Sequence, residues 1–334
     1  MRAEASASAR AWQAARALSA TCPRPLRRAV RMRLQRATAA RQGRRGWLRR
    51  LEPVFYIAPA FLVLAAILAY PLGYSFWLSF HEWTLRGFRQ GVPWVGLDNY
   101  VGLFSNVEFV SSLRVTFTFM AGALTLEFLF GMALALLLDH DLKGRGLMRS
   151  LILLPMMCTN VVIGLTWRLL FNYNFGLVNY YLVRLGLAPV EWLSKPAMAL
   201  PSVIIVDVWN TTSFVALLLL AGLQALPEEP FEAARIDGAS WWQVFRYLTL
   251  PLLRPTILVA LLWRIIDTFR IFDVVYLLTA GGPARASETV SIYVYRYGFQ
   301  TFNLGFASAA SYMMILIMLI MAVVLARLIG RSEA

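Results

Sequence analysis

The chain has 334 residues, of which 59% are apolar and 15% charged, and its mean hydropathy is +0.60. Soluble domains are about 45–50% apolar and about 25% charged, so this composition excludes an ordinary soluble globular domain. The formal net charge of +14 is concentrated at the N-terminus, because residues 1–50 hold 14 Arg, no Lys and one acid.

An Arg-rich tail precedes the first apolar run. Basic residues beside a membrane span hold that side in the cytosol, so we expect a cytosolic N-terminus. No folded module accompanies the arginines, and this favours a tail attracted to anionic lipids over a nucleic-acid-binding arm. The apolar run that follows is too long for a cleaved signal peptide. We therefore expect a disordered cytosolic tail over residues 1–52 and no nucleic-acid partner.

Six apolar segments follow the tail, and each has about the 20 residues that a spanning helix needs. The first and last, 53–80 and 303–326, contain no formal charge; the other four lie at about 115–138, 150–171, 199–222 and 255–278. The pattern predicts an all-α polytopic membrane protein with one six-helix transmembrane domain over residues 53–330. Six spans return the C-terminus to the cytosol and also place the loop 223–252 there.

Cysteine and histidine are scarce. Cys22 lies in the tail and Cys158 inside a predicted span, so no structural disulfide is expected. The only histidines, His81 and His140, fall at opposite membrane faces in this topology. We therefore expect neither a metal site nor histidine-based catalysis.

The loop 223–252 contains the stretch EAARIDGASWWQVFRYLTLP, which is more polar than the segments on either side. Prolines and acids at 227–230 favour the start of a helix. Gly238 favours a break just past the end of that helix. Ser240 and Gln243 then form a capping-box pattern that opens a second helix.

The second helix carries an apolar stripe, Trp241, Phe245 and Leu248. Pro251 and Pro255 are expected to end it before the next span. The loop therefore predicts a helix–turn–helix on the cytosolic surface with more apolar surface than a connector needs. Such a surface is typical of a docking element for another protein.

This stretch is similar to the "EAA" loop of binding-protein-dependent ABC importer permeases. The positions that carry the resemblance are Glu232, Ala233, Ala234, Gly238, Leu248, Leu250 and Pro251. The stretches PEEPFEAARIDGAS, GLDNY, FGLVN and LLTAGGP resemble the carbohydrate-uptake branch, of the maltose, trehalose and glycerol-phosphate type. The resemblance extends over about residues 54–328. It implies the type I ABC importer permease fold, six transmembrane helices with a cytosolic coupling loop.

The resemblance also implies a set of partners. Glu232, Ala233, Ala234 and Gly238 are expected to dock on an ATPase subunit and couple it to the membrane helices. The implied assembly adds a second, related permease, two nucleotide-binding subunits and an extracytoplasmic solute-binding protein, in a bacterial cytoplasmic (inner) membrane. No Walker A pattern occurs in this chain. ATP and Mg²⁺ are therefore expected on the partner subunits, with no cofactor and no enzymatic activity here.

Polar and ionisable groups inside the predicted spans mark a candidate substrate site, because such groups usually face a cavity or a partner. Two triplets at helical spacing match positions that line the sugar site of maltose-type permeases. They are Asp207, Thr211 and Phe214 on the fourth span and Arg264, Thr268 and Ile271 on the fifth. A structural ion pair between Asp207 and Arg264 is the competing interpretation, and both can hold at once.

Other polar residues in the spans have different expected roles. Asp267, Arg270 and Asp273 are expected towards the outer surface, where long side chains reach water at little cost. Glu127 is expected to hydrogen-bond another helix, and Asn160 fits either a structural or a ligand role. These residues are therefore left out of the predicted substrate site.

The predicted function is that of one permease subunit of a sugar importer. It would move a disaccharide such as trehalose or maltose by alternating access, driven by ATP hydrolysis on the partners. An anionic or polyol substrate is the alternative, since Arg264 would suit an anion. A membrane-embedded enzyme such as a glycosyl transferase is a further alternative, but its nearest constellation, Asp139 with Asp141, is more simply a charged loop.

Overall fold

The computed structural model describes residues 56–85, 91–140 and 143–330. The predicted tail, 1–52, lies outside these ranges, as does its boundary with the transmembrane domain. The chain divides into two units after Gly73, and each is described by itself. The described residues of the first unit, 56–73, are helical. They form the first part of a helix, Tyr56–Leu78, that is long and apolar enough to span a membrane.

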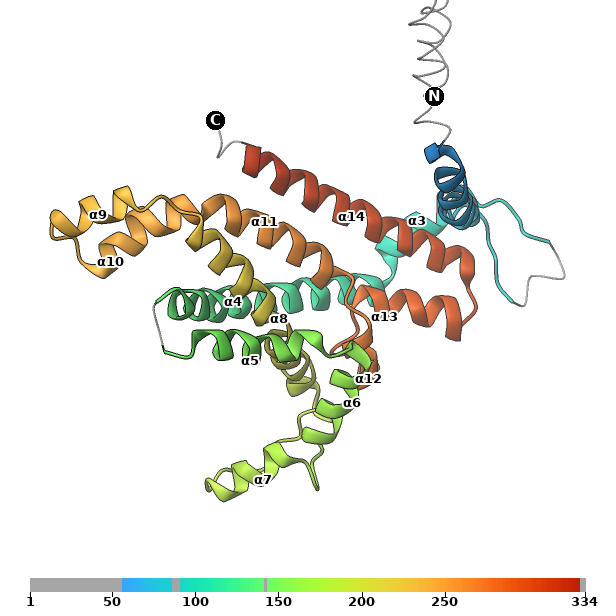
Figure 1. Ribbon diagram of the computed structural model, residues 1–334. Coiled ribbons are helices and arrows are strands. Elements are labelled where there is room, and N and C mark those ends of the chain that lie inside the picture. Colours follow the sequence, from blue (N-terminus) through green and yellow to red (C-terminus); the bar gives the residue numbers. More distant parts are fainter. Residues whose placement is uncertain (1–55, 86–90, 141–142, 331–334) are drawn as a thin grey trace, which may run out of the picture. The chain divides into compact units, whose positions relative to one another are not determined.

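The second unit is helical, and its described residues contain no strand, only two isolated bridges. Its helices are α3 Asp98–Ser105, α4 Val107–Asp139, α5 Arg145–Met157, α6 Asn160–Leu170, α7 Leu177–Arg184, α8 Pro196–Gln224, α9 Glu229–Ile236, α10 Trp241–Val244, α11 Leu250–Phe269, α12 Asp273–Leu278, α13 Val290–Tyr295 and α14 Leu304–Gly330 (Figure 1). Five helices of the described chain, Tyr56–Leu78 included, are long and apolar enough to span, and the number is six when the bent pair of α5 and α6 is counted as one span. The prediction of six spans is thus confirmed.

The third predicted span, 150–171, is not one straight helix. α5 and α6 meet at an angle of 92°. Pro155 lacks an N–H in the last turn of α5, and Cys158 and Thr159 are extended. The chain therefore turns sharply where uninterrupted apolar sequence predicted a continuous helix.

The prediction that Pro251 and Pro255 end a helix was wrong. α10 continues through a π-helical turn, Phe245–Thr249, directly into α11. The ring of Pro251 would crowd the carbonyl of Tyr247 in a regular α-helix, and the wider π turn removes that conflict. The end of the loop 223–252 and the fifth span therefore share one helix, Trp241–Phe269.

The predicted fifth span was also too long at its other end. α11 stops at Phe269, and a non-helical step, 270–272, separates it from α12. Non-helical backbone at membrane depth is tolerated where it lines a cavity rather than lipid. This break shapes the site described below.

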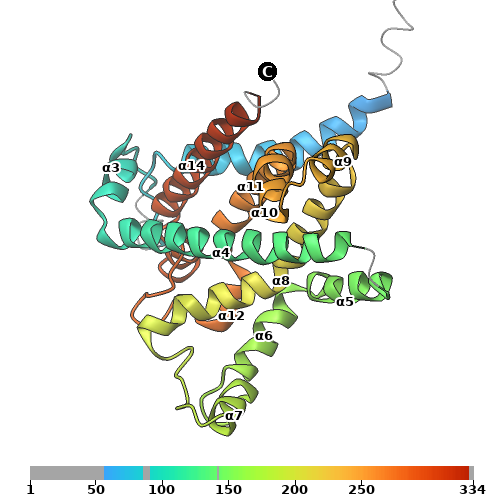
Figure 2. The same cartoon turned by 90° about the vertical axis from the view of Figure 1, so that its left-hand side faces the viewer.

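The core of the second unit is built on α4 and α8, which run side by side (Figure 2). A Cβ added at Gly131 of α4 would come within 2.8 Å of Val215 Cγ1 on α8. Small residues let helices in membranes approach closely, so glycine is required at this crossing. Apolar side chains of α4, α6, α8 and α12 fill one end of the interface, and those of α4, α8 and α11 fill the other.

Candidate functional site

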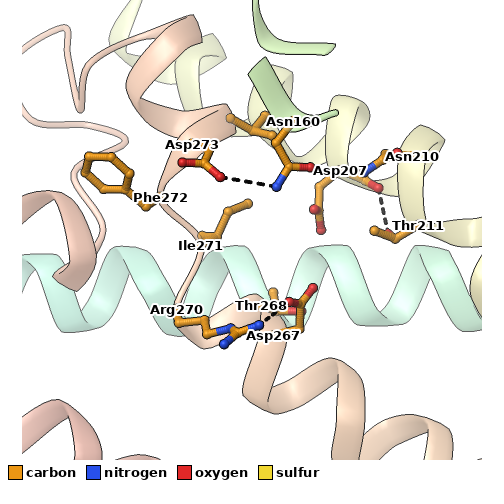
Figure 3. A pocket seen from close by; sticks show the side chains of 11 residues that line it. Asn160, Asp207, Asn210, Thr211, Asp267, Thr268, Arg270, Ile271, Phe272 and Asp273 are labelled. Atoms are coloured by element: carbon orange, nitrogen blue, oxygen red, sulfur yellow. Dashed lines mark hydrogen bonds and ion pairs between the residues drawn. The ribbon is translucent and has the colours of Figure 1, made fainter. Parts of the chain in front are cut away.

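A polar cavity of about 210 Å³ opens between the middle of α8, the start of α6 and the break after α11 (Figure 3). Its lining residues come from α6, α8, the end of α11, the break and the start of α12, and they are Asn160, Asp207, Asn210, Thr211, Asp267, Thr268, Arg270, Ile271, Phe272, Asp273 and Val274. Asn210 is the central residue of α8, Pro196–Gln224. The cavity therefore lies near the middle of a predicted span.

One fully buried arginine, Arg264, lies behind the wall of this cavity. The side chain of Arg264 has no exposed surface and faces three carboxylates. Its Nε donates to Glu127 Oε2 at 2.7 Å, and its Nη2 donates to Glu127 Oε1 at 2.6 Å and Asp207 Oδ2 at 2.9 Å. Its Nη1 donates to Asp267 Oδ2 at 2.6 Å. The bidentate bond to Glu127 is the strong planar geometry that only arginine provides.

The cluster ties three helices together. Glu127 comes from α4, Asp207 from α8, and Arg264 with Asp267 from α11. Thr211 Oγ1 lies 2.7 Å from both Glu127 Oε1 and the carbonyl oxygen of Asp207. The predicted helix–helix bond of Glu127 is present, and so is the ion pair between Asp207 and Arg264.

Four of the six predicted substrate residues, Asp207, Thr211, Thr268 and Ile271, line the cavity. The other two are placed elsewhere. Arg264 lies behind the wall, because its three carboxylate partners hold the guanidinium away from the opening. Phe214 packs on Trp263, with ring centroids 4.6 Å apart, and joins the apolar cluster of α4, α8 and α11.

Several lining residues were not predicted at this site. Asp267, Arg270 and Asp273 were expected towards the outer surface, yet all three line the cavity: Asp267 from the last turn of α11, and Arg270 and Asp273 from the break after it and the start of α12. Asn160, whose role the sequence left open, lies at the start of α6 and donates to Asp273 Oδ2 at the start of α12 at 3.3 Å. The helical spacing from Asp207 to Asn210 was the only sequence signal that pointed to Asn210.

The electrostatics of the cavity are dominated by carboxylates. Asp207, Asp267 and Asp273 line it, and Arg270 is the one guanidinium among the lining residues. The positive charge of Arg264 is already matched by its buried partners. Groups that accept hydrogen bonds therefore outnumber donors, which suits a ligand rich in hydroxyl donors and disfavours an anion.

The predicted coupling residues lie on an exposed helix–turn–helix at the end of α8. Glu232, Ala233 and Ala234 are on α9, and the Glu232 side chain is exposed. Gly238 has φ +73°, a backbone conformation that glycine adopts without strain. The predicted capping box is present, since Ser240 Oγ accepts from Gln243 N and Gln243 Oε1 accepts from Ser240 N.

A second hollow, of about 370 Å³, lies in the angle between α9 and α10. Ala234 and Gly238 are among its lining residues, with Tyr247 and Leu248 on the other side. Ile236, Trp241 and Tyr247 leave 86%, 62% and 69% of their surfaces exposed around it. Exposed apolar surface of this extent on a polar loop indicates a site for another protein.

Comparison with known proteins decides the family. Residues 109–333 match the family model described as "Binding-protein-dependent transport system inner membrane component". The chain belongs to this family. The match covers more than half of the chain and includes the cavity and the helix–turn–helix, so this permease is a component of a membrane transport system.

Several permeases of sugar transport systems are similar in sequence to most of this chain. It is 43% identical over 249 residues to the trehalose/maltose transport system permease protein MalF of Thermococcus litoralis, covering 75% of this chain and 82% of MalF. It is 37% identical over 303 residues to the trehalose transport system permease protein SugA of Mycobacterium tuberculosis, covering 91% and 96%. It is 33% identical over 290 residues to the sulfoquinovosyl glycerol transport system permease protein SmoG of Agrobacterium fabrum, covering 85% and 92%.

A solved structure shares the fold. A chain of a bacterial ABC transporter involved in the import of the acidic polysaccharide alginate superposes with a TM-score of 0.73 at 25% identity. The match covers 85% of this chain and 96% of that one. The permease therefore has the predicted type I ABC importer fold.

Proposed function

We propose that this permease moves a neutral saccharide, of the size of trehalose or maltose, through the cavity lined by Asp207, Asn210, Thr211 and Asp267. The observation that carries the proposal is the composition of the cavity wall, in which carboxylate, amide and hydroxyl groups gather near the middle of the span. Charge-assisted hydrogen bonds from sugar hydroxyls to carboxylates suit such a wall. Relatives named for trehalose and maltose support the same substrate class.

The charge balance separates the neutral substrate from the anionic alternative. Counted with the buried cluster, four carboxylates, Glu127, Asp207, Asp267 and Asp273, face two guanidiniums, Arg264 and Arg270, so an anion entering the cavity would meet net negative charge. Arg264, the residue that suggested an anionic substrate, already donates hydrogen bonds to Glu127, Asp207 and Asp267. A neutral polyhydroxyl substrate therefore fits this wall better than a sulfonated or phosphorylated one.

The proposed mechanism is alternating access powered by partner subunits. The cavity of about 210 Å³ is smaller than the roughly 300 Å³ or more of typical small-molecule sites. A second permease that faces this wall would enlarge and close the site. Two nucleotide-binding subunits that carry ATP and Mg²⁺ would dock on the helix–turn–helix of each permease, and a solute-binding protein would deliver the sugar. The complex would sit in a bacterial inner membrane with both termini of this chain cytosolic.

The test is uptake by the reconstituted complex. Proteoliposomes that hold the permease, its partner subunits and the solute-binding protein should import labelled trehalose or maltose only when ATP is supplied. Asp207→Asn should lower uptake by about tenfold, because one charge-assisted bond is weakened. Wild-type complex that imports neither sugar with ATP present would contradict the proposal.

A further inference from the structure

Four aromatic rings form a row that starts at the cavity. Phe272 and Tyr276 stack at 5.3 Å between ring centroids, and both contact Tyr295, each at 5.2 Å. Tyr295 stacks in turn on Phe299 at 5.4 Å. Phe272 and Tyr276 belong to the start of α12, whereas Tyr295 ends α13 and Phe299 lies in the π turn Arg296–Gln300. We call these four residues the aromatic row.

The inner end of the row is part of the cavity wall. Phe272 lines the cavity together with Asp273 and Asn160. Figure 3 shows its ring at one end of the view and Thr211 at the other. The row is thus continuous with the proposed sugar site.

The outer end of the row lies near the start of α4. Val290 N, at the start of α13, donates to Thr116 Oγ1 at 2.9 Å, whereas Arg296 bonds Glu108 at 2.7 Å. Following α13 from its first residue therefore leads towards the first turn of α4. The helix–turn–helix follows the end of α8, where α8 packs on the last turns of α4. The row therefore leads from the cavity to the end of the bundle opposite the helix–turn–helix of α9 and α10.

The ionic contacts of α13 hold the row in place. Arg296 bonds Glu108 and, at 2.8 Å, Glu288, and Arg285 pairs with Glu108 as well. Burial opposes the charge of Arg296, but its hydrogen bonds to the two glutamates outweigh that effect, and its pKa lies above the usual value. This anchor fixes the orientation of the helix face that carries Tyr295 and Phe299.

Only the inner end of the row touches the folded core, because Phe272 packs against the apolar cluster of α4, α6, α8 and α12. Tyr293 of α13 is fully buried and packs on Phe109 of α4. The residues of the row face away from that contact, and Tyr276 and Phe299 leave 37% and 67% of their surfaces exposed. Core packing therefore does not account for the exposed rings of Tyr276 and Phe299.

An aromatic belt against lipid is also a poor explanation. Tyrosine and tryptophan do gather at membrane interfaces. However, Phe272 shares its cavity with Asp207, Asp267, Arg270 and Asp273, and a wall with four ionisable groups does not face lipid. The row begins on this aqueous side of the helices.

We propose that the aromatic row is a stacking track along which a pyranoside moves between the outer end of the bundle and the polar cavity. A pyranose ring has apolar C–H faces and a polar rim of hydroxyl groups. An aromatic side chain covers one apolar face of the sugar while the hydroxyl groups of the rim stay hydrated. Phe272 stacks on Tyr276 and Tyr295 stacks on Phe299, so a sugar would meet the outer faces of these two pairs, where Tyr276 and Phe299 leave 37% and 67% of their surfaces exposed. The track rests on the proposed function, because its ligand is the transported saccharide.

The experiment compares sugar imported with ATP hydrolysed in proteoliposomes that hold the complete complex. The variants are the double change Tyr276→Ala with Tyr295→Ala and the matched control Tyr276→Phe with Tyr295→Phe, with trehalose and maltose as probes. The Ala variant should assemble and show normal ATPase stimulation by loaded binding protein. Its sugar imported per ATP should fall by about two- to tenfold for each ring removed. The Phe variant should keep the wild-type ratio, because it keeps both rings.

Three results would overturn the track: an unchanged ratio in the Ala variant, an equal loss in the Phe variant, or loss of the second permease from the purified Ala complex. The last would make the row a subunit contact. Wild-type complex that transports neither sugar would instead refute the proposed function itself. Transport by the wild-type complex therefore distinguishes failure of the stacking track from failure of the proposed function.

Discussion

At the scale of single residues, Arg264 determines how the three central helices meet. Its guanidinium is fully buried and donates to carboxylates of α4, α8 and α11. Burying charges costs several kcal/mol per ion, roughly, and only complete pairing offsets that cost. The cluster therefore fixes one relative arrangement of these helices, and the cavity wall depends on it.

We expect Arg264→Ala to destabilise the folded permease by about 3–5 kcal/mol, because Glu127 would stay buried without its partner. Thermal unfolding of the detergent-purified complex measures the loss. Asp267→Asn is the matched control, since that side chain is 33% exposed and can be hydrated; it should leave the unfolding midpoint near the wild-type value. Equal midpoints for Arg264→Ala and wild type would contradict the structural role.

The residue scale also shows the limit of inference from sequence. Charges in apolar segments are conspicuous, and together with the resemblance to maltose-type permeases they singled out Asp207 and Arg264. The direction in which the Arg264 side chain points could not be predicted, because it depends on Glu127, which lies 137 positions away in the sequence. Asp267 and Asp273 were misplaced for a similar reason, since no local signal marks the end of α11 at Phe269.

At the scale of elements, the close contact of α4 and α8 depends on Gly131. We expect Gly131→Leu to lower the unfolding midpoint and the yield of the complex, because even a Cβ would approach Val215 to 2.8 Å. Gly146→Leu on α5 is the matched control, since a Cβ there meets no atom within 4 Å. The same midpoint in both variants would show that the helices can separate without cost.

The helix–turn–helix of α9 and α10 gives a second prediction at this scale. Glu232 is exposed, so Glu232→Lys should leave the fold intact while ATP hydrolysis no longer responds to loaded binding protein. Gly238→Val should act similarly, because φ +73° is costly for a branched residue, and Gly238→Asn should retain most coupling. Binding-protein-stimulated ATPase activity is the readout. Normal stimulation in both Glu232→Lys and Gly238→Val would refute the docking role.

Helix boundaries were harder to predict than helix existence. The capping box and the glycine turn follow from local chemistry, and both are present. Pro251 was expected to stop a helix, but a π turn just before it lets the helix continue. The bend between α5 and α6 was missed because Pro155 lies within uninterrupted apolar sequence, where length alone predicts one span.

At the scale of the whole molecule, apolar segments of spanning length predicted the six spans, since hydropathy and length are properties of the chain itself. The cavity could be predicted only in part, because it is assembled from a helix bend, a helix break and the middle of α8. Its excess of carboxylates is a property of that assembly. This excess is the reason we propose a neutral rather than an anionic sugar as the substrate.

The most direct test is stimulation of ATP hydrolysis by the reconstituted complex across matched neutral and anionic sugars, each supplied with its loaded binding protein. We expect stimulation by trehalose or maltose and none by a sulfonated or phosphorylated sugar. Replacing Asp267 and Asp273 by Asn should narrow that difference, because it removes repulsion from the cavity wall. Stimulation by an anionic sugar in the wild-type complex, with none by the neutral disaccharides, would contradict the account.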